Sequence, residues 1–306
     1  MARRAAAANQ LIFVICMAGC ASTSTRDHSR AGAAGSTAEG GTNAAGASAA
    51  SSGGNAGDAD ADDNAGAHDN AGAADGGAGG EPANAASYSL FNGVDFAGWD
   101  RYLGKPSAGE PALGIDNDPR AVYSVVRLDS EPAIRISGEV WGSLISQREF
   151  CNFRLRAEFR WGSALWPPLN ARDSGIMFLS TGPLGAVNAG GNALSDPIGS
   201  GGFMVASEYQ IATGDVGKLY NLGPIAFSET QHSAGHEQPD SWNRVEISLQ
   251  DETASLLLND HEVSRASGFL LRWPDQPTVP LRCGKLQLQS EGAEIYFRRL
   301  EIEELP

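Results

Sequence analysis

A glutamate and a glutamine two residues apart, Glu208 and Gln210, form the pattern in this chain with the clearest chemical meaning. They belong to residues 207–217, whose start alternates in a way that predicts an extended strand. Residues two apart on a strand point to the same face, so these two side chains project together while Tyr209 faces the other way. A carboxylate beside an amide on one sheet face is suited to binding sugar hydroxyl groups.

A second carboxylate, Asp173, lies in residues 172–178, which we expect to form a neighbouring strand. Two adjacent carboxyl groups can serve as general acid and general base. Asp215 is an odd number of residues from Glu208, so it does not share the same strand face. We expect it to lie in the loop after the strand and to close the site. Each acidic residue also has a structural interpretation. Asp173 would cap a turn, Asp215 would be an ordinary turn residue, and Glu208 would pair with an arginine such as Arg156.

Two tryptophans, Trp161 and Trp166, precede a Pro-Pro loop just before the Asp173 segment. Their position makes them the best candidates in the chain for stacking on a sugar ring. Most tryptophans in a β-sandwich belong to the core, so burial is the alternative interpretation for both.

The elements that position these residues are predicted to be strands, because alternation is plentiful and helical periodicity is scarce. The clearest alternating segments are residues 153–160, 244–250, 286–289 and 295–302. At Leu300 the alternation shifts by one residue, which predicts a bulge or a strand that crosses between sheets. About ten to twelve strands without helical crossovers indicate an all-β sandwich of two antiparallel sheets, similar to a jelly roll.

Residues 1–20 are predicted to be an export signal. Two arginines precede an apolar run, 11–17, that is too short to span a bilayer as a helix of about 20 residues. The sequence Met-Ala-Gly-Cys resembles a bacterial lipobox, in which Cys20 becomes lipidated and anchors the protein to a membrane. Ser22, at the second mature position, favours the outer membrane. The alternative is an ordinary signal of a secreted protein.

Residues 21–86 lack every large apolar residue, so they cannot form a core and are predicted to be a flexible tether. Residues 87–306 are long enough for one domain. A net charge of −15 argues against a nucleic acid partner, which requires a basic face. Cys151 and Cys283 are the cysteines of this domain, and both a disulfide and two buried thiols are consistent with the sequence.

Several segments, taken in order, resemble a known family. They are residues 90–99, 149–162, 172–176, 208–215, 242–243, 284–289 and 297–298. The set covers nearly all of 88–306 and resembles the bacterial 3-keto-disaccharide hydrolase domain, also named 3-keto-glucoside 1,2-lyase/3-keto-2-hydroxy-glucal hydratase. The resemblance implies a concanavalin-A-like jelly roll that acts on an oligosaccharide or glycoside oxidised at C3.

The resemblance also implies site roles. A C3 ketone acidifies the C2 proton, a base removes it, the aglycone leaves from C1, and water adds across the double bond. Glu208 is the predicted base or metal-binding carboxylate, and Asp173 the second acid/base. The predicted substrate-binding residues are Gln210, Asp215, Arg156, Trp161, Trp166 and Gln289. Some family members are associated with a divalent metal, which would stabilise the enolate, but the metal ligands here are unknown.

Two departures from the family weaken the catalytic prediction. Leu179 follows Phe178 where relatives often carry a Tyr-His or Phe-Arg pair, and Leu256 stands where some carry a histidine. A non-catalytic, lectin-like lipoprotein is therefore the alternative. Catalysis predicts a second titratable group beside Glu208, whereas a lectin-like site predicts aromatic platforms and amides without a carboxylate pair.

Two other constellations are disfavoured. A retaining glycosidase needs two carboxylates about 5–5.5 Å apart, and the strand that carries Glu208 has no second carboxylate at that spacing. His232 and His236 have the spacing of metal ligands on a helix, with Glu237 beside them. The Ser-Ala-Gly sequence between the two histidines and the proline that follows predict a loop instead.

Overall fold

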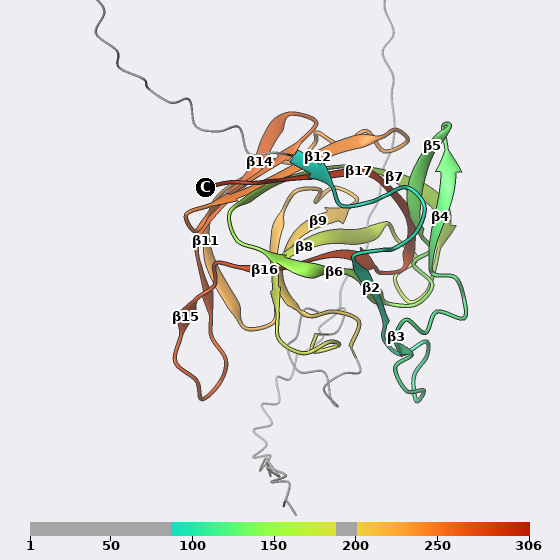
Figure 1. The fold of residues 1–306 in the computed structure, drawn as a ribbon, viewed down its shortest axis with the longest axis horizontal. Coiled ribbons are helices and arrows are strands. Elements are labelled where there is room, and N and C mark those ends of the chain that lie inside the picture. The colour runs from blue at the N-terminus through green and yellow to red at the C-terminus, as the bar shows by residue number, and fades with distance from the viewer. Residues whose placement is uncertain (1–86, 188–200) are drawn as a thin grey trace, which may run out of the picture. The chain divides into compact units, whose positions relative to one another are not determined.

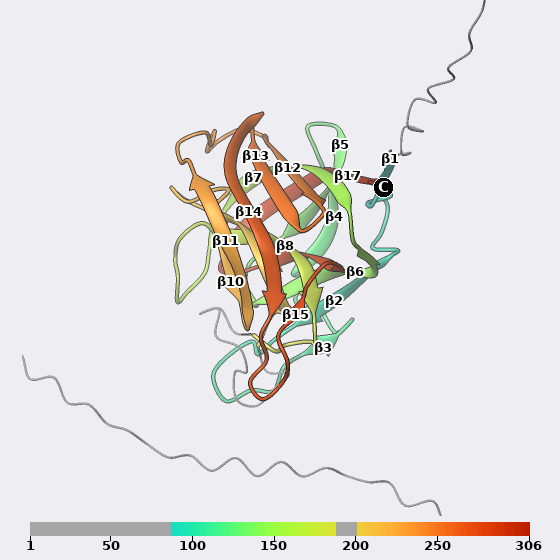
Figure 2. The same cartoon turned by 90° about the vertical axis from the view of Figure 1, so that its left-hand side faces the viewer.

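The structure is a computed structural model that describes residues 87–187 and 201–306. These residues contain seventeen strands and no helix, and the strands form two antiparallel sheets. The prediction of an all-β antiparallel sandwich is therefore confirmed. Figures 1 and 2 show the two layers, with β12, β7 and β17 in one and β8, β6 and β2 in the other.

The smaller sheet has seven strands in the order β10-β9-β8-β16-β6-β2-β3. Its strands are β2 (Trp99–Leu103), β3 (Gly114–Ile115), β6 (Gly142–Phe150), β8 (Asp173–Thr181), β9 (Val205–Ala212), β10 (Leu219–Leu222) and β16 (Gly284–Ser290). The predicted neighbours β8 and β9 lie side by side at its centre.

The larger sheet has ten strands, eight of them in the order β11-β14-β13-β12-β7-β17-β5-β4, with β1 beside β17 and β15 beside β14. Its strands are β1 (Ser87–Ser89), β4 (Tyr123–Leu128), β5 (Glu131–Ile136), β7 (Phe153–Leu165), β11 (Ile225–His232), β12 (Asn243–Gln250), β13 (Thr253–Leu258), β14 (His261–Leu271), β15 (Val279–Pro280) and β17 (Ala293–Glu304).

The core lies between the sheets and is built from the apolar positions of the alternating segments. Along β7 the buried residues Phe153, Leu155 and Phe159 alternate with partly exposed arginines and glutamates. The predicted shift of alternation near Leu300 is confirmed, because the pairing of β17 with β7 slips between Arg298 and Glu301. A bulge of this kind restores the inward direction of the apolar residues that follow.

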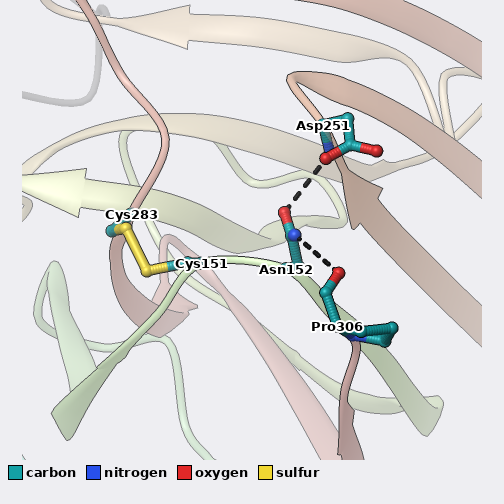
Figure 3. Close-up of a disulfide and its surroundings, with 5 residues drawn as sticks. All are labelled: Cys151, Asn152, Asp251, Cys283 and Pro306. Atoms are coloured by element: carbon teal, nitrogen blue, oxygen red, sulfur yellow. Dashed lines mark hydrogen bonds between the residues drawn. A yellow bond between two sulfur atoms is a disulfide. The ribbon is translucent and has the colours of Figure 1, made fainter.

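Cys151 and Cys283 form a disulfide, which settles the alternative that the sequence left open. Cys151 follows β6 and Cys283 precedes β16, two strands that pair in the smaller sheet. Next to the disulfide, the Asn152 side chain donates to the backbone oxygen of Pro306 and accepts from the backbone N–H of Asp251 (Figure 3). The turn after β6 is thus tied to both sheets.

The predicted signal, the lipidation site Cys20 and the tether lie in residues 1–86, outside the described residues. Nowhere in 87–187 or 201–306 does the chain form a helix of the length and apolar character that a membrane crossing requires.

Candidate functional site

The side chains of β8, β9 and β16 that point away from the other sheet form the candidate site. Tyr209 fixes this direction, because its hydroxyl crosses the sandwich and donates to the backbone oxygen of Leu257 on β13 at 3.1 Å. Glu208, one residue earlier, must therefore face outward. Across the strand pair Gly175 lies opposite Gln210, and Asp173 opposite Ala212, so Asp173 shares the outward face.

Gly175 lets the carboxyl group of Glu208 lie over β8. A Cβ atom added at Gly175 would stand 2.3 Å from Oε1 of Glu208, closer than two such atoms can approach. Glu208 pairs with Met177, so its carboxyl group leans along the sheet from Met177 over Gly175 and toward Asp173. The Ser-Gly-Ile sequence after Asp173 is thus required for the approach of the two carboxyl groups.

A third carboxyl group, from Glu291, completes the cluster and was not predicted. Gln287 on β16 pairs with Met177, so Gln289 continues the same outward face and Glu291 follows it at the turn before β17. Residues 287, 289 and 291 are each two apart, so in an extended strand they point to the same face. This spacing was the feature of the sequence that could have predicted the position of Glu291. The acidic cluster is defined here as Asp173, Glu208 and Glu291.

The cluster is buried, and its three carboxyl groups differ in acidity. Burial raises the pKa of Asp173 to about 6, although the backbone N–H of Ser174 lowers it. Burial and the charge of Asp173 raise the pKa of Glu208 to about 8, although a hydrogen bond with the side chain of Gln289 lowers this pKa. Burial, followed by the charges of Asp173 and Glu208, raises the pKa of Glu291 well above its usual range. At neutral pH Asp173 is therefore the ionised member of the Asp173–Glu208 pair. The shift at Glu291 favours its neutral form.

Three oxygens at this site are buried and have no hydrogen-bond partner among the described residues: Oδ1 of Asp173, Oε1 of Glu208 and Oε1 of Gln289. Buried polar atoms are normally satisfied, so unsatisfied ones point to a missing ligand. Oxygen donors suit a divalent metal, yet the described residues contain no group of three His, Cys, Asp or Glu placed to hold one. The arrangement thus fits a metal poorly, and no step below uses one.

Gly202 and Met204 are held against the same face of the smaller sheet. The Ser143 hydroxyl donates to the backbone oxygen of Gly202, and the Gln287 side chain accepts from the backbone N–H of Met204. Met204 packs with Tyr102 and Ile145 in a small apolar cluster separate from the main core. The chain that follows residues 188–200, which lie outside the described part, is therefore anchored beside the site.

Two predicted substrate-binding residues lie away from the acidic cluster, and their substrate-binding role stays a prediction. Arg156 is on β7, in the larger sheet, and its guanidinium bonds Glu246 at 2.9 Å. The suggested pairing of Arg156 with Glu208 is therefore wrong. Trp161 is a core residue that packs on Phe159 and donates its indole N–H to Glu237, so its ring is not an open platform.

Trp166 and Asp215 border the site. Trp166 is half-buried, donates its indole N–H to the backbone oxygen of Ser137, and bonds through its backbone to Gly292, next to Glu291. Asp215 lies in the β9–β10 turn, where Tyr220 and Lys218 contact its carboxyl group. Asp215 fits the turn-residue interpretation.

Gln210 is on the predicted face, and its side-chain oxygen accepts from the backbone N–H of Ile211. Gln289 is 1% exposed and lies on the same face as the acidic cluster, and its substrate-binding role stays a prediction. Leu179 and Leu256 are completely buried, and neither belongs to the acidic cluster.

The described residues thus form an antiparallel β-sandwich with three carboxyl groups gathered on the outer face of one sheet. Residues 86–303 match the model of the 3-keto-alpha-glucoside-1,2-lyase-like domain, and the chain belongs to this family. The resemblance that the ordered segments predicted is thereby confirmed. No curated protein matches the chain.

Similar solved structures include a protein of Parabacteroides distasonis that has been assigned to the glycosyl hydrolases. It is 17% identical, with a TM-score of 0.45 over 72% of this chain and 94% of that one. The carbohydrate-binding module CBM66 of Bacillus subtilis is 11% identical, with a TM-score of 0.35 over 59% and 91%. A β-glucanase of Bacillus licheniformis is 10% identical, with a TM-score of 0.37 over 74% and 100%.

Proposed function

We propose that this protein is an enzyme that cleaves 3-keto-glycosides by elimination followed by hydration. The observation that carries the proposal is the approach of the buried Glu208 carboxyl group, over Gly175, to the partly buried Asp173 on the neighbouring strand. The pKa values, about 6 for Asp173 and about 8 for Glu208, agree with a base and an acid. An elimination next to a ketone needs both groups in one site.

In the first step Asp173, ionised at neutral pH, removes the proton from C2. The C2–H electrons form a C2=C3 double bond and place negative charge on the C3 oxygen. This enolate then restores the C3 ketone and forms a C1=C2 double bond as the C1–O bond breaks. Glu208 gives its proton to the departing aglycone oxygen. This assignment reverses the roles predicted from the sequence, in which Glu208 was the base, because the group with the lower pKa is the one that is ionised.

In the second step the two residues exchange roles. Glu208, now ionised, takes a proton from water as the water oxygen bonds to C1. Asp173, now protonated, returns its proton to C2. The products are the free 3-keto sugar and the aglycone, and both carboxyl groups recover their starting states. A hydrolysis thus results without a covalent intermediate on the protein.

The competing function is lectin-like binding without catalysis. A binding site would rely on aromatic platforms and amides, and Trp161 belongs to the core instead. The acidic cluster argues for chemistry, since buried carboxyl groups without partners destabilise a fold and are retained mainly where they function.

We further propose that the domain acts in the cell envelope, anchored through a lipid on Cys20, as the lipobox-like sequence suggests. Metabolic labelling with a palmitate analogue tests this. Label should appear on the wild-type protein and be absent from Cys20→Ser, and an unlabelled wild-type protein would indicate secretion without an anchor.

The decisive test is release of the aglycone from a 3-keto-glucoside, followed with and without Mn²⁺. Asp173→Asn and Glu208→Gln should each lower kcat/KM by about 10²–10⁴. Glu246→Gln, on the outer face of the other sheet, is the matched control and should leave the rate unchanged. A wild-type protein that binds the keto sugar but releases no aglycone would establish the lectin-like function instead.

A further inference from the structure

We propose that Glu291 is a third catalytic group, a neutral carboxylic acid that donates a hydrogen bond to the C3 oxygen of the keto sugar while the C2 proton is removed. This role rests on the proposed function and deepens it. It supplies the enolate-stabilising donor that the reaction needs and that neither Asp173 nor Glu208 provides.

The position of Glu291 follows from the register of three strands. Gln289 extends the outward face of β16 alongside Gly175, and Glu291, two residues later, comes level with Asp173. The side chain is 6% exposed, and its charge interactions are with Asp173 and Glu208. Carboxyl groups from three adjacent strands or their ends therefore meet over one patch of the sheet.

The surroundings of Glu291 differ from those of Glu294, three residues later. Glu294 pairs with Arg135 at 2.6 Å and accepts from the backbone N–H of Ser163 at 3.0 Å. Although burial works against it, these contacts hold the pKa of Glu294 below its usual value. No described residue bonds to or pairs with the carboxyl group of Glu291, which leaves its O–H available to a ligand.

The chemistry assigns a donor to this position. When the C2 proton leaves, negative charge develops on the C3 oxygen, and a donor already in place stabilises that charge without reorganisation. A carboxylic acid kept neutral by its environment is a strong donor of this kind. Burial and the two neighbouring carboxyl groups favour the neutral form of Glu291, so it can keep its proton while Asp173 accepts one and Glu208 gives one.

The turn that carries Glu291 is fixed in place. The backbone N–H of Trp166 donates to the oxygen of Gly292 at 2.7 Å, and the N–H of Gly292 donates to Gly138 at 2.9 Å. The side chain of Leu169 packs against the same glycine, since a Cβ there would lie 3.4 Å from Leu169. A donor on such a turn is held in position before the substrate arrives.

The experiment isolates proton removal from departure of the aglycone. The probe is 1,5-anhydro-3-keto-glucitol, a keto sugar with no leaving group at C1, and NMR in D₂O follows exchange of its C2 proton by the full-length protein. Glu291→Gln, which keeps a neutral donor, should exchange within about tenfold of the wild type. Glu291→Met, of similar shape without a donor, should exchange about 10²–10³ times more slowly.

The outcomes separate the two proposals. Thermal unfolding first confirms that each variant folds, and if Glu291→Met does not, Glu291→Gln alone decides. A loss in Glu291→Gln of a hundredfold or more overturns the donor role, because an amide donates but does not exchange protons as a carboxyl group does. If Glu291→Met exchanges the C2 proton at the rate of the wild type, the donor role of Glu291 is also overturned. Absence of exchange in the wild type would instead reject the proposed function.

Discussion

The outer faces of the two sheets both carry glutamates, but only one face pairs them with arginines. On the larger sheet Glu158, Glu246 and Glu303 each have a guanidinium nitrogen within 3.0 Å. On the smaller sheet Asp173 and Glu208, together with Glu291, have no arginine or lysine partner among the residues that the structure describes.

The difference shows which face is built for stability and which for chemistry. A partly exposed ion pair contributes little, but it leaves no charge unsatisfied. A buried carboxyl group without a partner stays protonated and lowers stability when it must ionise. The acidic cluster is therefore an energetic liability that a stabilising core would not contain, which supports a functional reason for it.

The largest effect expected from the contrast between the two faces is on the pH dependence of the free energy of unfolding. Glu208 in the folded chain holds its proton up to a pKa of about 8, whereas an unfolded glutamate loses it near 4.5. The folded state binds more protons between these values, so stability is complete below pH 4.5 and falls as pH rises toward 8. Glu208→Gln should remove roughly 3 kcal/mol of that fall between pH 5 and 8, measured by urea unfolding.

Glu246→Gln is the control for that measurement, and it should keep the pH dependence of the wild type. An equal flattening in both variants would show that the paired and unpaired faces do not differ as described.

The next effect concerns the pH dependence of catalysis. Asp173 must be ionised and Glu208 protonated, so kcat/KM should fall tenfold per pH unit below about 6 and above about 8. Stopped assays of aglycone release from pH 4 to 10 measure both limbs. A single rise to a plateau above pH 8 would mean that Glu208 acts as the base, which restores the original assignment.

A smaller effect is expected on the paired face. Arg298 bonds Glu158 at 2.6 Å and stacks 4.0 Å from the centre of the Trp242 ring. Arg298→Met should lower the free energy of unfolding by about 2 kcal/mol, since Glu158 loses one of its two arginines. Aglycone release should not change. Arg148→Met, which removes a more exposed guanidinium, is the control and should alter stability by less than about 0.5 kcal/mol.

The smallest effect is expected at Arg156, whose pair with Glu246 is largely open to solvent. Arg156→Met should change the free energy of unfolding by less than about 1 kcal/mol and leave KM within twofold. A rise in KM of tenfold or more would support the substrate-binding role that the sequence suggested.

Much of the fold was predictable because alternation is a local signal. The segments in β7, β12, β16 and β17 carry it over their length, and even the bulge near Leu300 is visible as a change of phase. The predicted count of about ten to twelve strands was too low. Three of the seventeen strands have only two or three residues, too few to show a pattern, and they account for part of the difference.

The site was only partly predictable, because which sheet a strand joins is not a local property. Arg156 and Glu208 have similar sequence contexts, and only the strand order places them in different sheets. The Glu291-Gly292 dipeptide is typical of a turn, and Glu291 does lie in the turn between β16 and β17. Its shared phase with Gln287 and Gln289 was the signal that placed it on the outward face.

The disulfide between Cys151 and Cys283 joins residues that are 132 positions apart, and Asp173 and Glu208 both lie within the covalent ring that it closes. Residues 274–278, inside that ring, are exposed between β14 and β15. A protease that cuts the chain there would produce two fragments that the disulfide holds together until it is reduced. Such a cut would leave Asp173 and Glu208 on one fragment and Glu291 on the other, so the disulfide keeps all three carboxyl groups in one molecule.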